Sequence, residues 1–168
     1  MKIRFGIITV SDRSSRGERP DTAGPALVNS IQAQGWEVSR TAIVPDELKE
    51  LQNLLIEWAD LGEFDVILTT GGTGFGERDI TPEATLAVIE RRVDGIPEAM
   101  RAASMKVTLH AMLSRQAAGI RKKTLIVNLP GSPKGALENL DEIIPVIPHA
   151  VDLLRGDPGA EAGHRRLE

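Results

Sequence analysis

Residues 65–83 read DVILTTGGTGFGERDITPE, and this segment decides the fold. The short apolar and β-branched run DVILTT is typical of a strand that is buried inside a sheet. The glycine loop GGTGFG follows at once, and Thr81-Pro82-Glu83 then has the pattern of a helix start, with Thr81 as the cap and Pro82 in the first turn. The segment therefore predicts a strand, a glycine-rich turn and a helix in immediate succession.

The same alternation extends outward in both directions. Further buried strands are predicted at residues 2–10 and 124–129, another strand at 36–44, and helices at 22–34 and from about residues 45, 96 and 136 onward. Strands that alternate with helices indicate right-handed βαβ units, and near-continuous apolar strands indicate a sheet covered on both faces. We therefore expect an α/β fold, a three-layer domain with a mostly parallel central sheet and helices on both faces. It would occupy residues 1–155, and residues 156–168, which are almost without apolar content, would form a flexible tail.

The composition excludes several classes of protein. The 168 residues are 41% hydrophobic and 26% charged, which is the balance of one globular domain. Because the chain has no cysteine, disulfides, thiolate catalysis and sulfur-bound metals are excluded, and the three histidines lack metal-ligand spacing. A net charge of −4 argues against a nucleic-acid partner. No apolar run approaches the ~20 residues that span a membrane, and no signal peptide is recognisable, so we expect a cytoplasmic protein.

Polar segments follow four of the predicted strands, at the point where each strand ends. Ser11-Asp12-Arg13 follows the first strand, Pro45-Asp46 the second, the segment 71–79 the third and the segment 128–135 a later one. In an open parallel sheet, ligands bind outside the carboxyl ends of the strands, where the strand order switches. The four segments therefore predict one shared pocket, and their convergence is a stronger signal than any single motif.

The glycine loop itself indicates an anion site. Glycines at positions 71, 72, 74 and 76 let the backbone turn sharply and present its N–H groups, and the following helix adds the positive end of its dipole. The loop lacks the lysine of a Walker A motif, and Glu77 stands where GxGxxG requires its last glycine. A plain strand-to-helix turn without a ligand is the alternative interpretation.

Two aspartates stand beside these predicted loops. Asp46 and Asp79 each precede a helix, where a carboxylate commonly caps or charges the helix start. If both face a phosphate pocket, a divalent cation such as Mg²⁺ would offset their repulsion of the ligand. The residues alone leave both interpretations open.

The segment NLPGSPKG, residues 128–135, is a second glycine- and proline-bearing loop. Asn128 offers a donor and an acceptor to a purine or a ribose, and Lys134 offers a point charge to a phosphate. A surface turn with a solvated lysine is the simpler alternative. Ser114-Arg115 is likewise compatible with ordinary polar surface ahead of a strand.

Three long segments resemble one known family. TTGGTGFGERDITPEATLAVIER, LSRQAAGIRKKTLIVNLPGSPKG and the opening TVSDR…DTAGPAL are similar to molybdopterin adenylyltransferases of the MoaB/Mog family, which is related to the G domain of gephyrin. The similarity extends from Ile3 to about Leu154. It implies transfer of AMP from Mg-ATP to the terminal phosphate of molybdopterin, with release of pyrophosphate. It also implies a homotrimer and, because the chain has no second domain for metal insertion, transient contact with a separate molybdate-inserting enzyme.

The resemblance also assigns roles to individual residues. It implies catalytic and Mg²⁺-binding roles for Asp46 and Asp79, and a molybdopterin contact for Thr9, Ser11 and Asp12. The nucleotide would be bound by Gly71, Gly72, Thr73, Gly74, Ser114, Asn128, Pro130, Gly131, Ser132 and Lys134. Because the attacking phosphate is already an anion, such a reaction needs alignment and charge neutralisation rather than a histidine or cysteine base.

Two other functions compete with this one. Some members of the MoaB branch share the fold and the GGTG loop without catalysis, so the chain is alternatively a molybdopterin carrier or scaffold. A general nucleotide-binding regulator is the third hypothesis. The retained segment RDITPE, residues 78–83, favours the catalytic branch.

Overall fold

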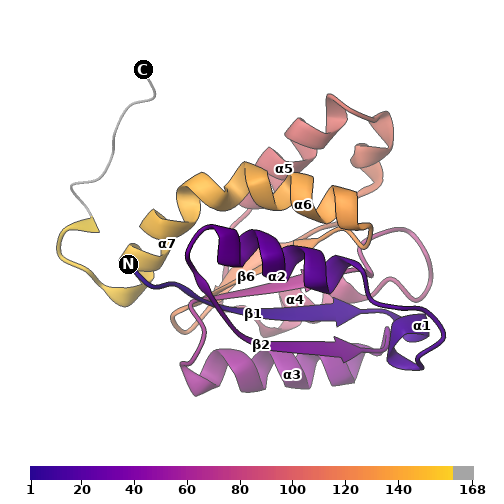
Figure 1. Cartoon of the computed structure of the whole chain (residues 1–168), viewed down its shortest axis with the longest axis horizontal. Coiled ribbons are helices and arrows are strands. Elements are labelled where there is room, and N and C mark those ends of the chain that lie inside the picture. Colours follow the sequence, from indigo (N-terminus) through magenta and orange to yellow (C-terminus); the bar gives the residue numbers. More distant parts are fainter. Residues whose placement is uncertain (161–168) are drawn as a thin grey trace.

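The computed structural model describes residues 1–160 as one mixed arrangement of strands and helices (Figure 1). The elements follow one another as β1 (Arg4–Val10), α1 (Asp12–Ser15), α2 (Ala23–Ala33), β2 (Glu37–Val44), α3 (Leu48–Leu61), β3 (Val66–Thr70), α4 (Thr81–Val88), β4 (Arg91–Arg92), α5 (Gly95–Met105), η1 (Leu109–Leu113), β5 (Ala118–Arg121), β6 (Thr124–Leu129), α6 (Pro133–Ile143), η2 (Ile144–Val146) and α7 (Ile147–Arg155).

The six strands form one sheet in the order β2-β1-β3-β6-β5-β4. The first four strands in that order are parallel to one another, whereas β5 pairs antiparallel with β6, and β4 pairs antiparallel with β5. The chain adds β2 on one side of β1 and β3 on the other, so the strand order switches between β1 and β3. This switch is where a parallel sheet opens a crevice at its carboxyl edge.

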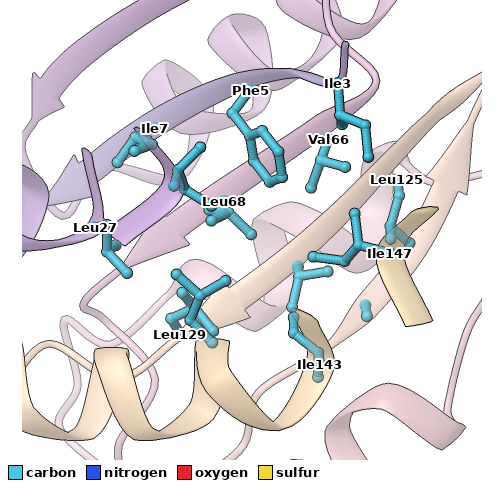
Figure 2. Close-up of a cluster of buried hydrophobic side chains, with 14 of the residues drawn as sticks. Ile3, Phe5, Ile7, Leu27, Val66, Leu68, Leu125, Leu129, Ile143 and Ile147 are labelled. Carbon is cyan, nitrogen blue, oxygen red and sulfur yellow. The ribbon is translucent and has the colours of Figure 1, made fainter. Parts of the chain in front are cut away.

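Helices cover both faces of the sheet, which confirms the predicted three-layer α/β architecture. In Figure 1, α2, α6 and α7 lie on one side of the strands and α3 lies on the other. Side chains alternate along each strand, so β1 sends Phe5 and Ile7 into the first core and Ile8 and Val10 into the second. Figure 2 shows the first core, in which strand residues such as Val66 and Leu125 pack with helix residues such as Ile143.

Several local predictions need correction. Thr81 does not cap α4; its hydroxyl donates to the carbonyl of Gly71 at 2.8 Å, which ties the helix back to the glycine loop. The antiparallel strands β4 and β5 and the short helix α1 were not predicted, because four residues or fewer carry no detectable periodicity. The helix expected from residue 136 begins at Pro133, and Ser132 is its cap.

Residues near the expected C-terminal boundary are described as far as Ala160. Helix α7 ends at Arg155, and Gly156 follows in the left-handed conformation. Within the predicted tail, the amide of Ala160 donates to the carbonyl of Asp157, and Ala160 is buried. The remainder of the predicted tail, residues 161–168, lies outside the described residues. In residues 1–160, no helix is both long and apolar enough to cross a membrane.

Candidate functional site

The segments that follow β1 and β2 are joined directly at the carboxyl edge of the sheet. The amide of Ser11 donates to the carbonyl of Val44 at 2.9 Å. Asp12 and Asp46 then bind one another reciprocally, because the amide of each donates to the carboxylate of the other, at 2.9 and 3.0 Å. The first two predicted strand ends are therefore held as one unit.

The segments after β3 and β6 form a second unit at the same edge. The hydroxyl of Thr70 donates to the carbonyl of Pro130 at 2.6 Å, and the amide of Gly71 donates to the carbonyl of Leu129 at 3.2 Å. Gly71 has a φ of 104°, and a Cβ on it would lie 2.3 Å from the carbonyl oxygen of Val10. Only glycine lets the end of β3 approach β1 this closely.

Arg78 bridges the two units. Its guanidinium donates to both carboxylate oxygens of Asp12, at 2.5 and 3.0 Å, and to Glu47 at 2.7 Å. The glycine loop after β3 is thereby tied to the segments after β1 and β2. All four predicted strand-end segments therefore meet at one edge, as expected from the sequence.

A cavity of about 690 Å³ lies between these units; we call it the aspartate cavity. Three arginines from the segment after β1, Arg13, Arg16 and Arg19, line it together with Asp21. Of the residues predicted for the site, it is lined by Thr9, Ser11, Asp12, Asp46, Gly71, Gly72, Asp79, Gly131 and Ser132.

The carboxylate of Asp46 lies in this cavity among other negative charges. Burial raises the pKa of Asp46, and the negative charges of Asp12 and Asp79 raise it further. Asp12 behaves in the opposite way, because its hydrogen bonds from Arg78 lower its pKa to about 2. Neither Asp46 nor Asp79 forms an ion pair with a cationic side chain among residues 1–160.

This arrangement fits a divalent cation that is shared with a ligand. In the part of the chain that the structure describes, no three His, Asp or Glu side chains are grouped to hold a metal by themselves. Mg²⁺ is usually held by one or two carboxylates and completes its shell with water and phosphate oxygens. Asp46 and Asp79 could supply the two carboxylates, and a polyphosphate in the aspartate cavity would supply the remaining oxygens.

A second cavity of about 330 Å³ lies on the other side of the glycine loop; we call it the Ser114 cavity. Four of the predicted residues line it, namely Thr73, Gly74, Ser114 and Pro130. Its remaining wall comes from α5, η1 and α6, including Arg101, Ser104, His110 and Glu138. This wall was missed from the sequence, because helix periodicity around residues 95–113 does not indicate which side chains face a ligand.

Asn128, which was predicted to bind the nucleotide, does not line either cavity. It is fully buried, and its amide nitrogen donates to the hydroxyls of Thr69 and Thr85 at 3.0 and 2.8 Å. Its side-chain oxygen accepts from the amide of Ala117 at 3.1 Å. The donors and the acceptor of the Asn128 side chain therefore all have partners inside the protein.

Lys134 also lies apart from both cavities. Its side chain is 81% exposed, and its ammonium group is 3.8 Å from Glu138, one helical turn further along α6. Ser132, two residues earlier, does line the aspartate cavity, while its hydroxyl accepts from the amide of Gly135 and caps α6. The predicted loop thus divides into a part at the site and a solvated lysine outside it.

A match to a known family accompanies this geometry. Residues 6–149 match the family described as "Probable molybdopterin binding domain". The chain belongs to the MoaB/Mog family of molybdopterin-binding domains. It is 43% identical over 157 residues to a protein of Helicobacter pylori (strain J99) named molybdopterin adenylyltransferase, an alignment that covers 92% of this chain and 89% of that one.

Two further relatives show the breadth of the family. Gephyrin of Dictyostelium discoideum is 45% identical over 163 residues, which is 91% of this chain but 23% of the length of that protein. The crystal structure of the molybdopterin biosynthesis enzyme MoaB of Thermus thermophilus superposes with a TM-score of 0.87 at 48% identity, covering 93% of this chain and 98% of that one. These matches connect the chain to molybdenum cofactor biosynthesis.

Proposed function

We propose that this protein is a molybdopterin adenylyltransferase, which transfers AMP from Mg-ATP to the terminal phosphate of molybdopterin and releases pyrophosphate. The observation that carries the proposal is the placement of Asp46 and Asp79 in one cavity beside the glycine loop. Relatives that are about 40% identical over nearly the whole chain carry the name of this activity.

We further propose that the aspartate cavity takes the Mg-nucleotide and the Ser114 cavity takes the pterin. The aspartate cavity is the larger, at about 690 against 330 Å³, and it alone combines the two carboxylates with arginines from the segment after β1. This assignment gives Thr9, Ser11 and Asp12 to the nucleotide side, whereas the sequence-based prediction gave them to molybdopterin. Thr73, Gly74, Ser114 and Pro130 pass correspondingly to the pterin side.

The reaction requires these side chains to bind and align the substrates, and it requires no general base. A terminal phosphate oxygen of molybdopterin forms a bond to the α-phosphorus of ATP, and the bond between that phosphorus and the β-phosphate oxygen breaks. The electron pair leaves with pyrophosphate, so no base has to remove a proton. Bound Mg²⁺ would neutralise charge on the phosphates, while Asp46 and Asp79 hold it and the glycine loop aligns the two anions.

A pyrophosphate assay with paired variants tests the proposal. The protein is mixed with Mg-ATP and molybdopterin, and pyrophosphate is followed for wild type, Asp79→Ala and Glu77→Ala. Glu77 is the matched control, since it is an exposed carboxylate in the same loop and lines neither cavity. We expect Asp79→Ala to lower the rate about 10³-fold and Glu77→Ala to leave it unchanged. Equal rates in wild type and Asp79→Ala would remove Asp79 from the mechanism.

The assignment of the two cavities has a separate test. Ala111 lines the Ser114 cavity, so Ala111→Trp should fill that space. We expect this variant to raise the KM for molybdopterin while binding of an ATP analogue, measured by calorimetry, stays as in wild type. Weaker binding of the ATP analogue with an unchanged KM for molybdopterin would reverse the assignment.

A non-catalytic carrier of the MoaB type is the second candidate function. It is favoured by the similarity to MoaB, which is 48% identical to this chain. A carrier would bind molybdopterin both as wild type and as Asp79→Ala, and would release no pyrophosphate from ATP. We also propose a homotrimer that contacts the molybdate-inserting enzyme transiently; light scattering of the purified protein would test the trimer.

A further inference from the structure

Arg115 cross-links the glycine loop through four donors. Its amide donates to the carbonyl of Thr73 at 3.0 Å. Its guanidinium donates to the carbonyls of Gly74 and Asp79, each at 2.6 Å, and to the carboxylate of Glu83 in the first turn of α4. One side chain thus joins the beginning of the loop, its end and the helix that follows.

The tip of the glycine loop is largely exposed, so buried contacts do little to hold it in place. Phe75 at its tip is 70% exposed, and Gly76, Glu77 and Arg78 are exposed as well. The loop contains an internal bond from the amide of Gly76 to the carboxylate of Asp79, at 2.8 Å, which fixes the carboxylate only relative to the loop. The position of the loop relative to the sheet therefore depends on Thr81 at its base, Arg78 on one flank and Arg115 on the other.

Arg115 itself stands on a rigid base. The next residue, Gln116, is buried, and its side-chain amide donates to the carbonyl of Asn128 at 3.1 Å and to Asn139 at 2.9 Å. The preceding residue, Ser114, lines the second cavity. The side chain of Arg115 thus extends from a fixed segment beside the Ser114 cavity to the backbone of Asp79, which lines the aspartate cavity.

We propose that Arg115 is a positioning residue, which acts on the adenylyl transfer by holding the backbone of Asp79 in place. The planar guanidinium suits this task, because it can donate to several fixed acceptors at once. The catalytic part of this inference rests on the proposed function. The structural part, that Arg115 orders residues 74–79, does not.

A double-mutant cycle tests whether Arg115 acts through Asp79. We expect Arg115→Ala to lower kcat about 10²-fold in an otherwise wild-type protein, because a small displacement of a catalytic group has this effect. In the Asp79→Ala background, the same substitution should change kcat by less than about twofold. Losses that multiply across the two backgrounds would show that Arg115 acts independently of Asp79 and would overturn the proposal.

A matched arginine provides the control. Arg121 donates to both carboxylate oxygens of Asp60, at 2.9 and 2.7 Å, and to the carbonyl of Val88, and it lines neither cavity. Arg121→Ala should leave kcat unchanged. If Arg115→Ala fails to fold, Arg115→Lys replaces it, since lysine keeps the charge but loses the planar fork.

Amide hydrogen exchange tests the structural part without any substrate. The amides of Gly76 and Asp79 are bonded inside the loop, so they report directly on its order. We expect exchange across residues 74–79 to be at least about tenfold faster in Arg115→Ala than in wild type or Arg121→Ala. Unchanged exchange would overturn the positioning role of Arg115. A wild-type protein that releases no pyrophosphate would overturn the proposed function, and the exchange rates would still show whether Arg115 orders residues 74–79.

Discussion

Asp65 lies at the edge of the sheet where the parallel strands begin, and Asp46 lies at the edge where they end. The two carboxylates differ in their hydrogen bonds and in the charges around them. Asp65 precedes β3, at the edge where the parallel strands begin. Its carboxylate accepts five hydrogen bonds, three from Arg4 and two from Arg155. Burial alone would raise its pKa, but these bonds outweigh burial, and the pKa is lowered. All of its interactions are internal to the protein.

Asp46 lies where the strands end, and its carboxylate accepts fewer hydrogen bonds than that of Asp65. It accepts one bond, from the amide of Asp12, and the carboxylates of Asp12 and Asp79 stand nearby. Its pKa is raised because burial and the negative charges of Asp12 and Asp79 outweigh the opposing effects of the Asp12 amide and of Arg78. The comparison supports the proposed role of Asp46: the charge of Asp65 is balanced by two arginines within the fold, whereas that of Asp46 is left for a ligand to balance.

The same substitution at the two positions should therefore give opposite results, and the largest effect should fall on activity at Asp46. Asp46→Asn keeps the shape and an acceptor for the amide of Asp12 but removes the charge that would hold a cation. We expect pyrophosphate release to fall about 10³-fold, with the Mg²⁺ dependence weakened and the thermal unfolding temperature undiminished. A variant that loses activity only in proportion to its folded fraction would contradict this account.

Asp65→Asn should affect stability instead. The substitution leaves Arg4 and Arg155 without their shared anion, and Asp65 is the buried member of the cluster, with 6% of its side chain exposed. Removing one partner of a buried ion pair costs about 3 kcal/mol in the free energy of unfolding. Urea unfolding would measure this loss. Activity per folded molecule should equal that of wild type, and a specific loss of kcat would show that the two edges are not independent.

Two glycines extend the comparison from side chains to backbone. Gly62, near the Asp65 edge, has a φ of 70°, and Gly72, in the aspartate cavity, has a φ of 66°. Alanine in this conformation costs about 1–2 kcal/mol at either position. A Cβ at Gly62 would meet no atom within 4 Å, whereas at Gly72 it would lie 2.3 Å from the hydroxyl of Thr81 and 3.1 Å from Asp46 Oδ1.

We therefore expect Gly62→Ala to show the backbone cost alone, and Gly72→Ala to show a greater loss of stability together with a loss of activity. Unfolding measurements and the pyrophosphate assay on both variants would separate the two contributions. Equal losses of stability, with activity kept in both, would mean that the space beside Gly72 is not needed.

The sequence predicted the meeting of the strand ends because that meeting follows from topology alone. Once strands and helices alternate, the segments after β1, β2, β3 and β6 must reach the same edge. Which side chains face the cavity depends on contacts that no local pattern records. The internal contacts of Asn128 are an example, since its partners Thr69 and Thr85 lie 59 and 43 residues away along the chain.

The division of the site into two cavities was also beyond the sequence. It depends on the path of the glycine loop, which Arg115 and Thr81 hold through tertiary bonds. Asp65 gave no sequence signal either, because its arginine partners are 61 residues before it and 90 residues after it. Contacts between residues far apart in the sequence thus determine the environment of the polar side chains at both edges of the sheet, whereas the fold itself could be predicted from local sequence patterns.

The smallest expected effect is a difference in how the two aspartates respond to acid, measured without metal. Because the folded pKa of Asp65 is lowered, its stabilisation is complete above the unfolded value of about 3.9 and is lost as the pH falls through the folded pKa. Because the folded pKa of Asp46 is raised, its ionised form opposes folding, and this cost disappears as the pH falls through that higher pKa.

Unfolding free energies in EDTA, from about pH 3 to about pH 7, would resolve the two contributions. The stability deficit of Asp65→Asn should shrink only below about pH 4, whereas the small stability gain of Asp46→Asn at neutral pH should already shrink above about pH 4 and be gone near that pH. Mg²⁺ with an ATP analogue should then reverse the second result, since a bound cation turns the Asp46 carboxylate from a cost into a ligand. If the unfolding free energies of both variants change in the same pH range and with the same sign, the two aspartates do not differ electrostatically. The proposed binding of a cation by Asp46 would then be contradicted.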